Sequence, residues 1–421
     1  MHFKNIKFVL FIFFVSFINS ESILIKNATI LDGKDNEPFI GNVLIEGNRI
    51  SKVSKSNLRG DKVIDASGKI LTPGIIATDT ELGIVEIGAL SVTRDDSSDL
   101  YKIGFSIFDA FNPNSVLIPW NRSNGITSAL TLPQNTDSPI GGLGSFFVLD
   151  SNLEISGSSD IVMIGRVGGR GDGSRAETYA IIKDLLEFAS SLDQSDIKSN
   201  SNISELIDNS SIAESMDLHP RDVRALYKLI NNDLPLIMKA NRASDILKLI
   251  ELKKKYNLNL IIMGAQEAGL VAEKIAKNDI PLIINPINNI PGSFDELASN
   301  INLAGKLEKQ GVTLMFNAPR DHNYHLIRQG AGVAVAHGMS YAGAMKALTL
   351  SPVEVFGLGS RGQIESGKIA DLIIWDADPL EPSSMPEKVF LSGEDIDLTT
   401  RMSRLTERYT KNKNKPNGYR D

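Results

Sequence analysis

The sequence predicts an α/β fold: a (β/α)8 TIM-like barrel with a small β-sandwich domain built from both chain ends. Three observations lead to this prediction. Strand-like segments separated by turns open the chain after residue 21, apolar segments then alternate with amphipathic ones, and strand-like segments return near the end. With 421 residues, the chain has room for one large domain and a smaller one.

The first 20 residues have the pattern of a secretory signal peptide. Lys4 and Lys7 precede the apolar run FVLFIFFVSFI at 8–18, and the small residue Ser20 ends it. An uncleaved anchor is the alternative, but the run is shorter than the ~20 residues that span a bilayer. We therefore expect cleavage after Ser20, a periplasmic or secreted protein, and no membrane span after cleavage.

Residues 21–71 and 359–397 are expected to form one composite β-sandwich domain. ILIKNATIL and GNVLIEGNRISKVS are strand-like segments in the first range, and GKIADLIIWDADP and KVFLSG are their counterparts in the second. The first range is too short for a stable sandwich of its own, so the two chain ends are expected to combine. Residues 398–421 are basic and rich in Asn and Lys, which predicts a disordered tail.

The barrel is expected over residues 72–358. Amphipathic segments such as RASDILKLIELKKKY at 242–256 separate the apolar ones, as the crossovers of a parallel sheet require. The apolar segments that read as strands buried on both faces are 125–133, 160–169, 234–241, 258–266, 280–286 and 311–319.

Composition excludes several functions. The formal net charge of −7 argues against a nucleic-acid partner, which would require a basic face. The chain has no cysteine, which excludes disulfides and thiolate metal sites. A small-molecule ligand or substrate remains the expected partner.

Six stretches carry a family resemblance, and they follow one another along nearly the whole chain after the signal peptide. They are NATILDGKDNEPFIGNVLIEGNRISKV (27–53), IDASGKILTPGII (64–76), FNPNSVLIPWNRSNGIT (111–127), KANRASDI (239–246), GAGVAVAHGMSYAGAMKALTLSPVEVFGL (330–358) and GQIESGKIADLIIWDADPLE (362–381). In these motifs the chain resembles the amidohydrolase superfamily, specifically its imidazolonepropionase-like and related cyclic-amidohydrolase members.

The resemblance implies hydrolysis of C–N bonds with one or two divalent metals at the carboxyl ends of the barrel strands. The implied ligands are a His pair on the first strand, His on the fifth and sixth, and Asp on the eighth. Some members add a carboxylated lysine on the fourth strand. The metal lowers the pKa of a bound water, which then attacks the substrate.

This chain departs from the implied ligand set at each of those strands. Asp79 and Glu81 replace the first His pair, and Lys239 ends the fifth strand. The sixth strand ends at Met263 and Gly264, and the eighth at Asn317. Ordinary binuclear zinc catalysis is therefore not expected. One prediction is that the ammonium of Lys239 lies against Asp79 or Glu81 in place of the metal.

Two further groups could contribute to a site at the barrel mouth. Asp321 and His322 follow the eighth strand, and with Asp79 and Glu81 they could bind Mg²⁺, Mn²⁺ or Ca²⁺ through oxygen ligands. Alternatively, Asp321 caps a helix and the histidine is structural. The glycine-rich stretch GRVGGRGDGSR at 165–175 is expected to be a loop, and its arginines could form a wall for an anionic ligand.

Three functions remain open from the sequence. The protein could be a C–N hydrolase with a rearranged site, or a catalytically inactive ligand-binding module. It could also be an oligomer partner, either of its own copies or of a related active amidohydrolase.

Overall fold

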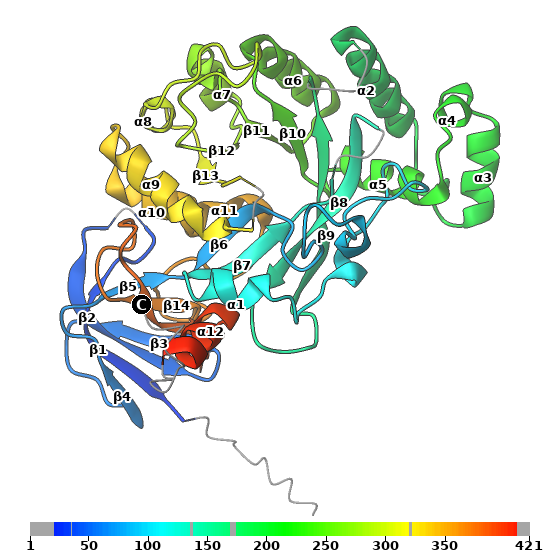
Figure 1. Cartoon of the computed structure of the whole chain (residues 1–421). Coiled ribbons are helices and arrows are strands. Elements are labelled where there is room, and N and C mark those ends of the chain that lie inside the picture. Colours follow the sequence, from blue (N-terminus) through cyan, green and yellow to red (C-terminus); the bar gives the residue numbers. More distant parts are fainter. Residues whose placement is uncertain (1–20, 35, 135–137, 169–173, 320–321, 411–421) are drawn as a thin grey trace, which may run out of the picture.

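The computed structural model describes residues 21–410, apart from 35, 135–137, 169–173 and 320–321. The predicted signal peptide at 1–20 therefore lies outside the described residues. Two sheets organise the fold, one in the barrel and one made from the two chain ends (Figure 1). In the described part of the chain, no helix is long and apolar enough to cross a membrane.

The barrel sheet has eight strands in the order β13-β12-β11-β10-β9-β8-β7-β6. Thr78 on the first of these strands donates a 2.9 Å hydrogen bond from Oγ1 to the carbonyl of Phe316 on the last, which links the two ends of the sheet. The strands are β6 (Ile75–Thr80), β7 (Ile126–Thr131), β8 (Ile140–Val148), β9 (Gly157–Arg166), β10 (Leu236–Ala240), β11 (Leu260–Gly264), β12 (Leu282–Ile284) and β13 (Leu314–Phe316).

The predicted α/β barrel is confirmed, with one departure from a regular (β/α)8 pattern. Strand β8 runs antiparallel to both of its neighbours, β7 and β9, whereas the other neighbouring pairs in this sheet are parallel. Its nine residues are all buried, and four of them are Gly or Ser. The sequence prediction missed this strand because glycine and serine interrupt the apolar pattern by which the other strands were recognised.

Helices surround the barrel and cover its outer face (Figure 1). Side chains alternate along each strand, so that Met238 packs outward into the large core under the helices while Ile237 packs inward. The helices are α1 (Leu117–Arg122), α2 (Arg175–Ser190), α3 (Asn200–Asp208), α4 (Ser211–Ser215), α5 (Pro220–Ile230), α6 (Ala243–Tyr256), α7 (Ala272–Lys277), α8 (Leu303–Lys309), α9 (Ile327–Ala336), α10 (Tyr341–Leu348) and α11 (Leu350–Phe356).

The second sheet draws its strands from both chain ends, as the sequence predicted. Its order is β16-β15-β14-β5-β1-β2-β3, with β4 also paired to β1, and its core includes Ile30, Val43 and Ile374. The domain bounds given above stay a prediction. The strands are β1 (Ile23–Ile30), β2 (Phe39–Glu46), β3 (Arg49–Ser54), β4 (Lys62–Asp65), β5 (Ile70–Pro73), β14 (Leu372–Trp375), β15 (Pro386–Leu391) and β16 (Glu394–Asp395).

Trp375 at the end of β14 joins this sheet to the barrel. The indole is fully buried, and its Nε1 donates a 2.8 Å hydrogen bond to Thr72 Oγ1, just before the first barrel strand. The guanidinium of Arg328 on α9 lies 4.7 Å from the ring centroid. Burial lowers the pKa of Arg328 to about 10, and carbonyl oxygens of Pro379 and Ser384 accept its hydrogen bonds.

The expected disordered tail is wrong for part of its length. Residues Arg401–Thr410 form helix α12, although the helix buries none of its residues. The basic composition, rich in Asn and Lys, predicted disorder, but the Thr400 and Ser403 side chains satisfy backbone groups at the helix start. Residues 411–421 lie outside the described residues.

Candidate functional site

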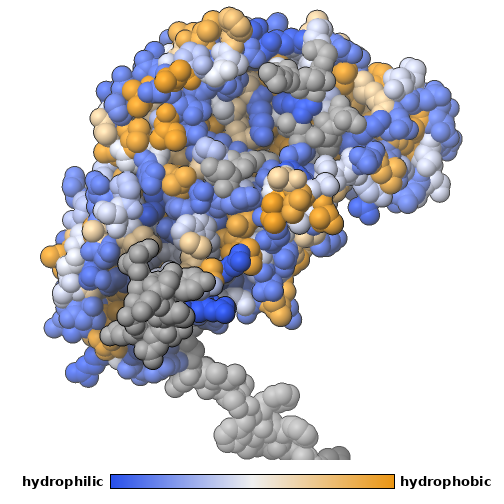
Figure 2. Space-filling model, viewed as in Figure 1, coloured by the Kyte–Doolittle hydropathy of each residue, from blue (hydrophilic) through white to orange (hydrophobic). Residues whose placement is uncertain are grey.

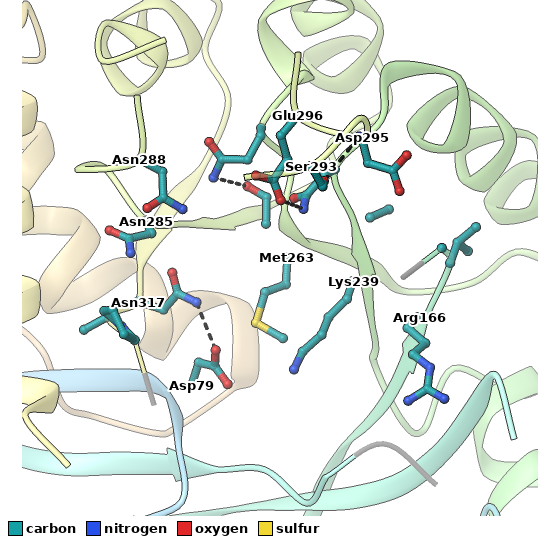
Figure 3. Close-up of a pocket in the computed structure, with 18 residues that line it drawn as sticks. Asp79, Arg166, Lys239, Met263, Asn285, Asn288, Ser293, Asp295, Glu296 and Asn317 are labelled. Atoms are coloured by element: carbon teal, nitrogen blue, oxygen red, sulfur yellow. Dashed lines mark hydrogen bonds between the residues drawn. The ribbon is translucent and has the colours of Figure 1, made fainter. Parts of the chain in front are cut away.

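A cavity of about 640 Å³ opens at the carboxyl ends of the barrel strands (Figure 3). This is the end of an α/β barrel at which active sites lie. Polar side chains dominate its wall. The lining residues are Asp79, Arg166, Val167, Gly168, Lys239, Ala240, Asn241, Met263, Gly264, Gln266, Asn285, Asn288, Ser293, Asp295, Glu296, Asn317, Ala318 and Pro319.

The alternation of strand side chains places these groups. Two residues before Lys239, on the same face of β10, Ile237 belongs to an apolar cluster inside the barrel. Ile164 precedes Arg166 in the same way on β9, and Met315 precedes Asn317 at the end of β13. Each of these three strands therefore contributes an apolar side chain to the barrel interior and, two residues further along, a side chain to the cavity.

Asp79 and Asn317 meet across the cavity wall. Nδ2 of Asn317 donates a 2.9 Å hydrogen bond to Oδ2 of Asp79, drawn as a dashed line in Figure 3. Asp79 is almost completely buried, with 7% of its surface exposed. Since a carboxylate can only accept, this bond fixes the orientation of the Asn317 amide, and its Oδ1 is buried with no hydrogen-bond partner.

Glu81 is not among the residues that line the cavity. It lies one residue beyond β6 and is buried, and its carboxylate is 3.8 Å from the guanidinium of Arg94. Its backbone N–H donates to the hydroxyl of Tyr324 over 3.0 Å. The two neighbouring acidic residues therefore have different surroundings. The carboxylate of Asp79 lies on the cavity wall, and that of Glu81 lies near Arg94.

Lys239, Arg166 and Met263 come from three neighbouring parallel strands. Lys239 pairs in register with Arg166 on one side and with Met263 on the other. In the view of Figure 3, Lys239 lies between Arg166 and the pair of Asp79 and Asn317. Two cationic side chains thus stand at adjacent positions of the cavity wall.

The long loop between β12 and α8 forms the opposite wall and is fastened to the barrel by its acidic residues. Asp295 accepts hydrogen bonds from Arg175 and, over 2.7 Å, from Arg242. Glu296 accepts one from Nδ2 of Asn241 over 2.7 Å. These carboxylates hold the loop against the strand ends.

Arg175 at the start of α2 completes this anchor. It also forms a 3.0 Å ion pair with Asp245, which is buried on α6. Burial alone would lower the pKa of Arg175, but its hydrogen bonds to Asp245 and Asp295 outweigh that effect and raise the pKa. The guanidinium therefore stays charged and links two helices to the cavity loop.

The end of β11 has a backbone that only glycine adopts easily. Gly264 has φ +89°, and a Cβ at this position would overlap Oδ1 of Asn241. Two residues on, Gln266 is 2% exposed and donates from Nε2 to the carbonyl of Gly264 over 3.3 Å. Its Oε1 is buried with no hydrogen-bond partner.

Of the predicted pair Asp321 and His322, Asp321 lies outside the described residues. His322 is not among the residues that line the cavity. His322 has φ +74°, and its carbonyl accepts a 2.9 Å hydrogen bond from Nδ2 of Asn121. Of the arginines expected in an anion-binding wall, Arg166 lines the cavity and Arg175 binds Asp295 instead.

Several cavity residues were not singled out from the sequence. Gln266 and Asn285 follow directly after buried strands, so the rule that barrel sites lie at strand ends could have found them. Ser293, Asp295 and Glu296 lie far along a loop, where no strand pattern indicates which side chains return to the barrel.

Comparisons with known proteins agree with this architecture. Residues 240–402 match the amidohydrolase family model. Amidohydrolase tasK of Hapsidospora irregularis is 23% identical over 396 residues, covering 84% of this chain and 40% of that protein. An amidohydrolase structure from Thermotoga maritima superposes with a TM-score of 0.74 at 24% identity, covering 89% of this chain and 99% of that one.

This chain belongs to the amidohydrolase superfamily. A shorter match, 38% identical over 90 residues, is to 5-methylthioadenosine/S-adenosylhomocysteine deaminase of Carboxydothermus hydrogenoformans, and it covers 20% of this chain and 19% of that protein. The chain thus spans well under half the length of these curated relatives. The structural likeness shows the fold of this amidohydrolase-superfamily member.

The side chains that line the cavity can be compared with the ligands that a divalent metal of this superfamily would need. Among the described strand-end side chains that line the cavity, Asp79 is the one carboxylate, and it already accepts a hydrogen bond from Asn317. Lys239 brings an ammonium and Met263 a thioether, neither of which suits a hydrolytic Mg²⁺ or Zn²⁺ site. No group of three or more His, Asp or Glu among the described residues could hold a metal ion.

Proposed function

We propose that this protein is an exported, catalytically inactive member of its superfamily that binds a small polar molecule in the barrel-mouth cavity. The observation that carries this proposal is the hydrogen bond between Asn317 and Asp79. It joins the positions at which the superfamily places metal ligands on the first and eighth strands. Here a neutral amide satisfies the carboxylate that would otherwise face a metal.

The backbone on the sixth strand supports the same proposal. A histidine in place of Gly264 would need a strained backbone and would collide with Asn241. Two positions on different strands therefore each oppose a metal ligand for a separate physical reason. The residues present do not fit the hydrolytic metal, and we derive no catalytic step through it.

Export is part of the proposal and rests on the signal-peptide pattern at residues 1–20. Expression of the full chain in a Gram-negative host, followed by fractionation, tests it. Mass spectrometry of the product should find an N-terminus at Glu21 in the periplasmic fraction. A full-length chain in the cytoplasm would contradict it.

Metal content is the decisive test of the inactive state. We expect purified protein to contain far less than one equivalent of zinc, manganese or iron, also after incubation with each metal and desalting. The same preparation should show no turnover of dipeptides, hydantoins or lactams. Near-stoichiometric metal together with turnover that Asp79→Ala abolishes would contradict the proposal.

Hydrolysis of C–N bonds is the alternative function, and the position of Asp79 favours it. The carboxylate lines the cavity at the end of the first strand, where a general base of a barrel enzyme would stand. If this alternative holds, Asp79→Asn should abolish turnover of one of these substrates while leaving its binding measurable.

A role as oligomer partner is the second alternative, and exposed apolar residues on the cavity loop favour it. Figure 2 shows apolar surface on the part of this face that lies over α7 and α8. Ile290 and Phe294 on the loop are 78% and 84% exposed, and Leu297 is 64% exposed. Light scattering of the purified chain, and its co-purification with a related barrel protein, would distinguish homo-oligomers from hetero-oligomers.

A further inference from the structure

The barrel-mouth cavity combines charged side chains that already have partners with carboxamide groups that a ligand can reach. We propose that it binds a neutral, hydroxyl-rich molecule of the size of a mono- or disaccharide. The hydroxyl groups of this ligand would contact the side chains of Asn241, Asn285 and Asn288. This inference rests on the ligand-binding role proposed above and specifies its ligand.

The charged side chains of the strand ends and of Glu296 interact within the protein. Asp79 accepts a hydrogen bond from Asn317, and Arg166 and Lys239 each interact with other groups of the chain. Glu296 accepts hydrogen bonds from a side-chain amide and from a backbone N–H. A charged ligand would therefore have to compete with partners that are already in place.

Positive and negative charges around the cavity are also equal in number. This holds among the described lining residues together with the ion-pair network of the cavity loop. The cations are Arg166, Arg175, Lys239 and Arg242, and the carboxylates are Asp79, Asp245, Asp295 and Glu296. Burying a charge without a partner is costly, and each charge of a zwitterion carries the same cost. A neutral ligand avoids it.

Asn241 presents an oriented acceptor to the cavity. Its Nδ2 donates to Glu296, which can only accept, so its Oδ1 lies on the other side of the amide, beside Gly264. A Cβ at Gly264 would overlap this oxygen. Asn241 is partly exposed, and its Oδ1 is not enclosed in the way that the amide oxygens of Asn317 and Gln266 are. Glycine at 264 therefore leaves an acceptor that a ligand can reach.

Asn285 and Asn288 supply two more carboxamides from the wall that the cavity loop forms. Asn285 is partly exposed, and its Oδ1 accepts a 3.3 Å hydrogen bond from the backbone N–H of Ile287, so its Nδ2 can donate to a ligand. Asn288 is exposed and offers both a donor and an acceptor. In the view of Figure 3, these two residues lie on the opposite side of the cavity from Lys239 and Arg166.

A wall with donors and acceptors, but with its charges already paired, matches hydroxyl groups. Each hydroxyl donates one hydrogen bond and can accept two. The described lining residues include no aromatic side chain, so a nucleobase or another flat ring would have no stacking partner. The volume of about 640 Å³ lies within the ~300–1,000 Å³ of small-molecule sites. These features favour a sugar or polyol over a nucleoside.

Isothermal titration calorimetry with matched probes tests the inference. The neutral probes are glucose, galactose, mannose, maltose and lactose. Glucuronate and galacturonate add a carboxylate to the same ring, and glucosamine and galactosamine add an ammonium group. Dipeptides and neutral nucleosides complete the set. We expect a neutral sugar to bind, and to bind ~10-fold or more tightly than its charged counterparts.

Two variants locate the contacts. Asn285→Leu and Asn288→Leu remove the carboxamide but keep a side chain of similar shape, and each should weaken binding of that sugar by ~10-fold. Asn289→Leu is the matched control, because Asn289 is exposed but is not among the residues that line the cavity. It should bind as wild type does. Thermal unfolding checks that each variant is folded, and if one of the first two is not, the other decides.

The outcomes separate this inference from the function on which it rests. If a charged sugar binds as tightly as its neutral counterpart, the ligand class is wrong and the binding role stands. Wild-type affinity in the folded Asn285→Leu and Asn288→Leu variants has the same meaning, as has a preference for dipeptides or nucleosides. If no probe binds, the proposed binding function fails, and the inference fails with it.

Discussion

The inside of the barrel has two layers that differ in chemistry although the same strands build both. The inner layer is apolar and includes Ile164, Ile237 and Ile283. One pleat further along the same strands, Arg166, Lys239 and Asn285 line the cavity. Strand geometry alone directs both the apolar and the polar side chains toward the barrel axis. The type of residue at each position then decides whether its layer stabilises the fold or can contact a ligand.

The largest effect is expected from the apolar layer. Ile237→Ala should lower the free energy of unfolding by about 2–5 kcal/mol, because it opens a cavity among fully buried side chains. Urea denaturation followed by circular dichroism measures it. Leu270→Ala is the control, since Leu270 is 64% exposed and should change the free energy by less than about 0.5 kcal/mol. Equal effects of the two substitutions would remove the distinction between interior and surface.

Asn317→Asp tests the hydrogen bond between Asn317 and Asp79 in the polar layer at the barrel mouth. It replaces the hydrogen bond to Asp79 with two carboxylates in contact, which should cost about 1–3 kcal/mol at pH 7. The contact raises the pKa of the carboxylate pair above its unfolded value. The folded variant therefore binds protons more readily, and the loss of stability should fade as the pH falls toward 4.

Urea denaturation at pH 7 and pH 4.5 checks this sign. Asn317→Leu removes the same hydrogen bond without adding a charge, so its effect should not fade with acidification in this way. If Asn317→Asp is as stable as wild type at pH 7, the two side chains do not form the close contact described above.

Asp295→Asn tests the loop that closes the cavity. It weakens the contacts to Arg175 and Arg242 and should cost about 1–2 kcal/mol, a modest value because all three side chains are partly exposed. Hydrogen exchange should rise in the loop from Asn285 to Asn302 and stay unchanged in β10. Asp233→Asn at an exposed position is the matched control.

The smallest effect on stability is expected at Lys239. Lys239→Met removes one of two adjacent positive charges, but it also removes the interactions that the ammonium makes within the protein. Because these two effects oppose each other, the free energy of unfolding should stay within about 1 kcal/mol of wild type. Thermal and urea unfolding measure it. A loss of several kcal/mol would place Lys239 with the structural layer rather than the ligand-binding one.

Much of the fold followed from local pattern. The apolar segment at 234–241 predicted β10 because its buried side chains alternate between the barrel interior and the helix layer. The segment at 140–148 did not predict β8, since its glycine and serine residues carry little apolar signal. Closure of the sheet around it, not its own composition, makes it a strand.

The site was predicted in part. Asp79, Lys239 and Asn317 were found because each follows a strand that the sequence revealed, and the structure places all three on one cavity wall. Glu81 was expected beside Asp79, but the chain leaves β6 at Thr80 and its carboxylate lies near Arg94. Asp295 could not be foreseen because its place depends on Arg175 and Arg242, far away in the sequence.

The sequence by itself determined the superfamily and the barrel, because both depend on residue identity at a regular spacing. Only the tertiary structure decided which way the Asn317 and Gln266 amides face and that Arg166 stands beside Lys239. Hydrogen-bond partners and strand register set those features, and both join residues that are distant along the chain.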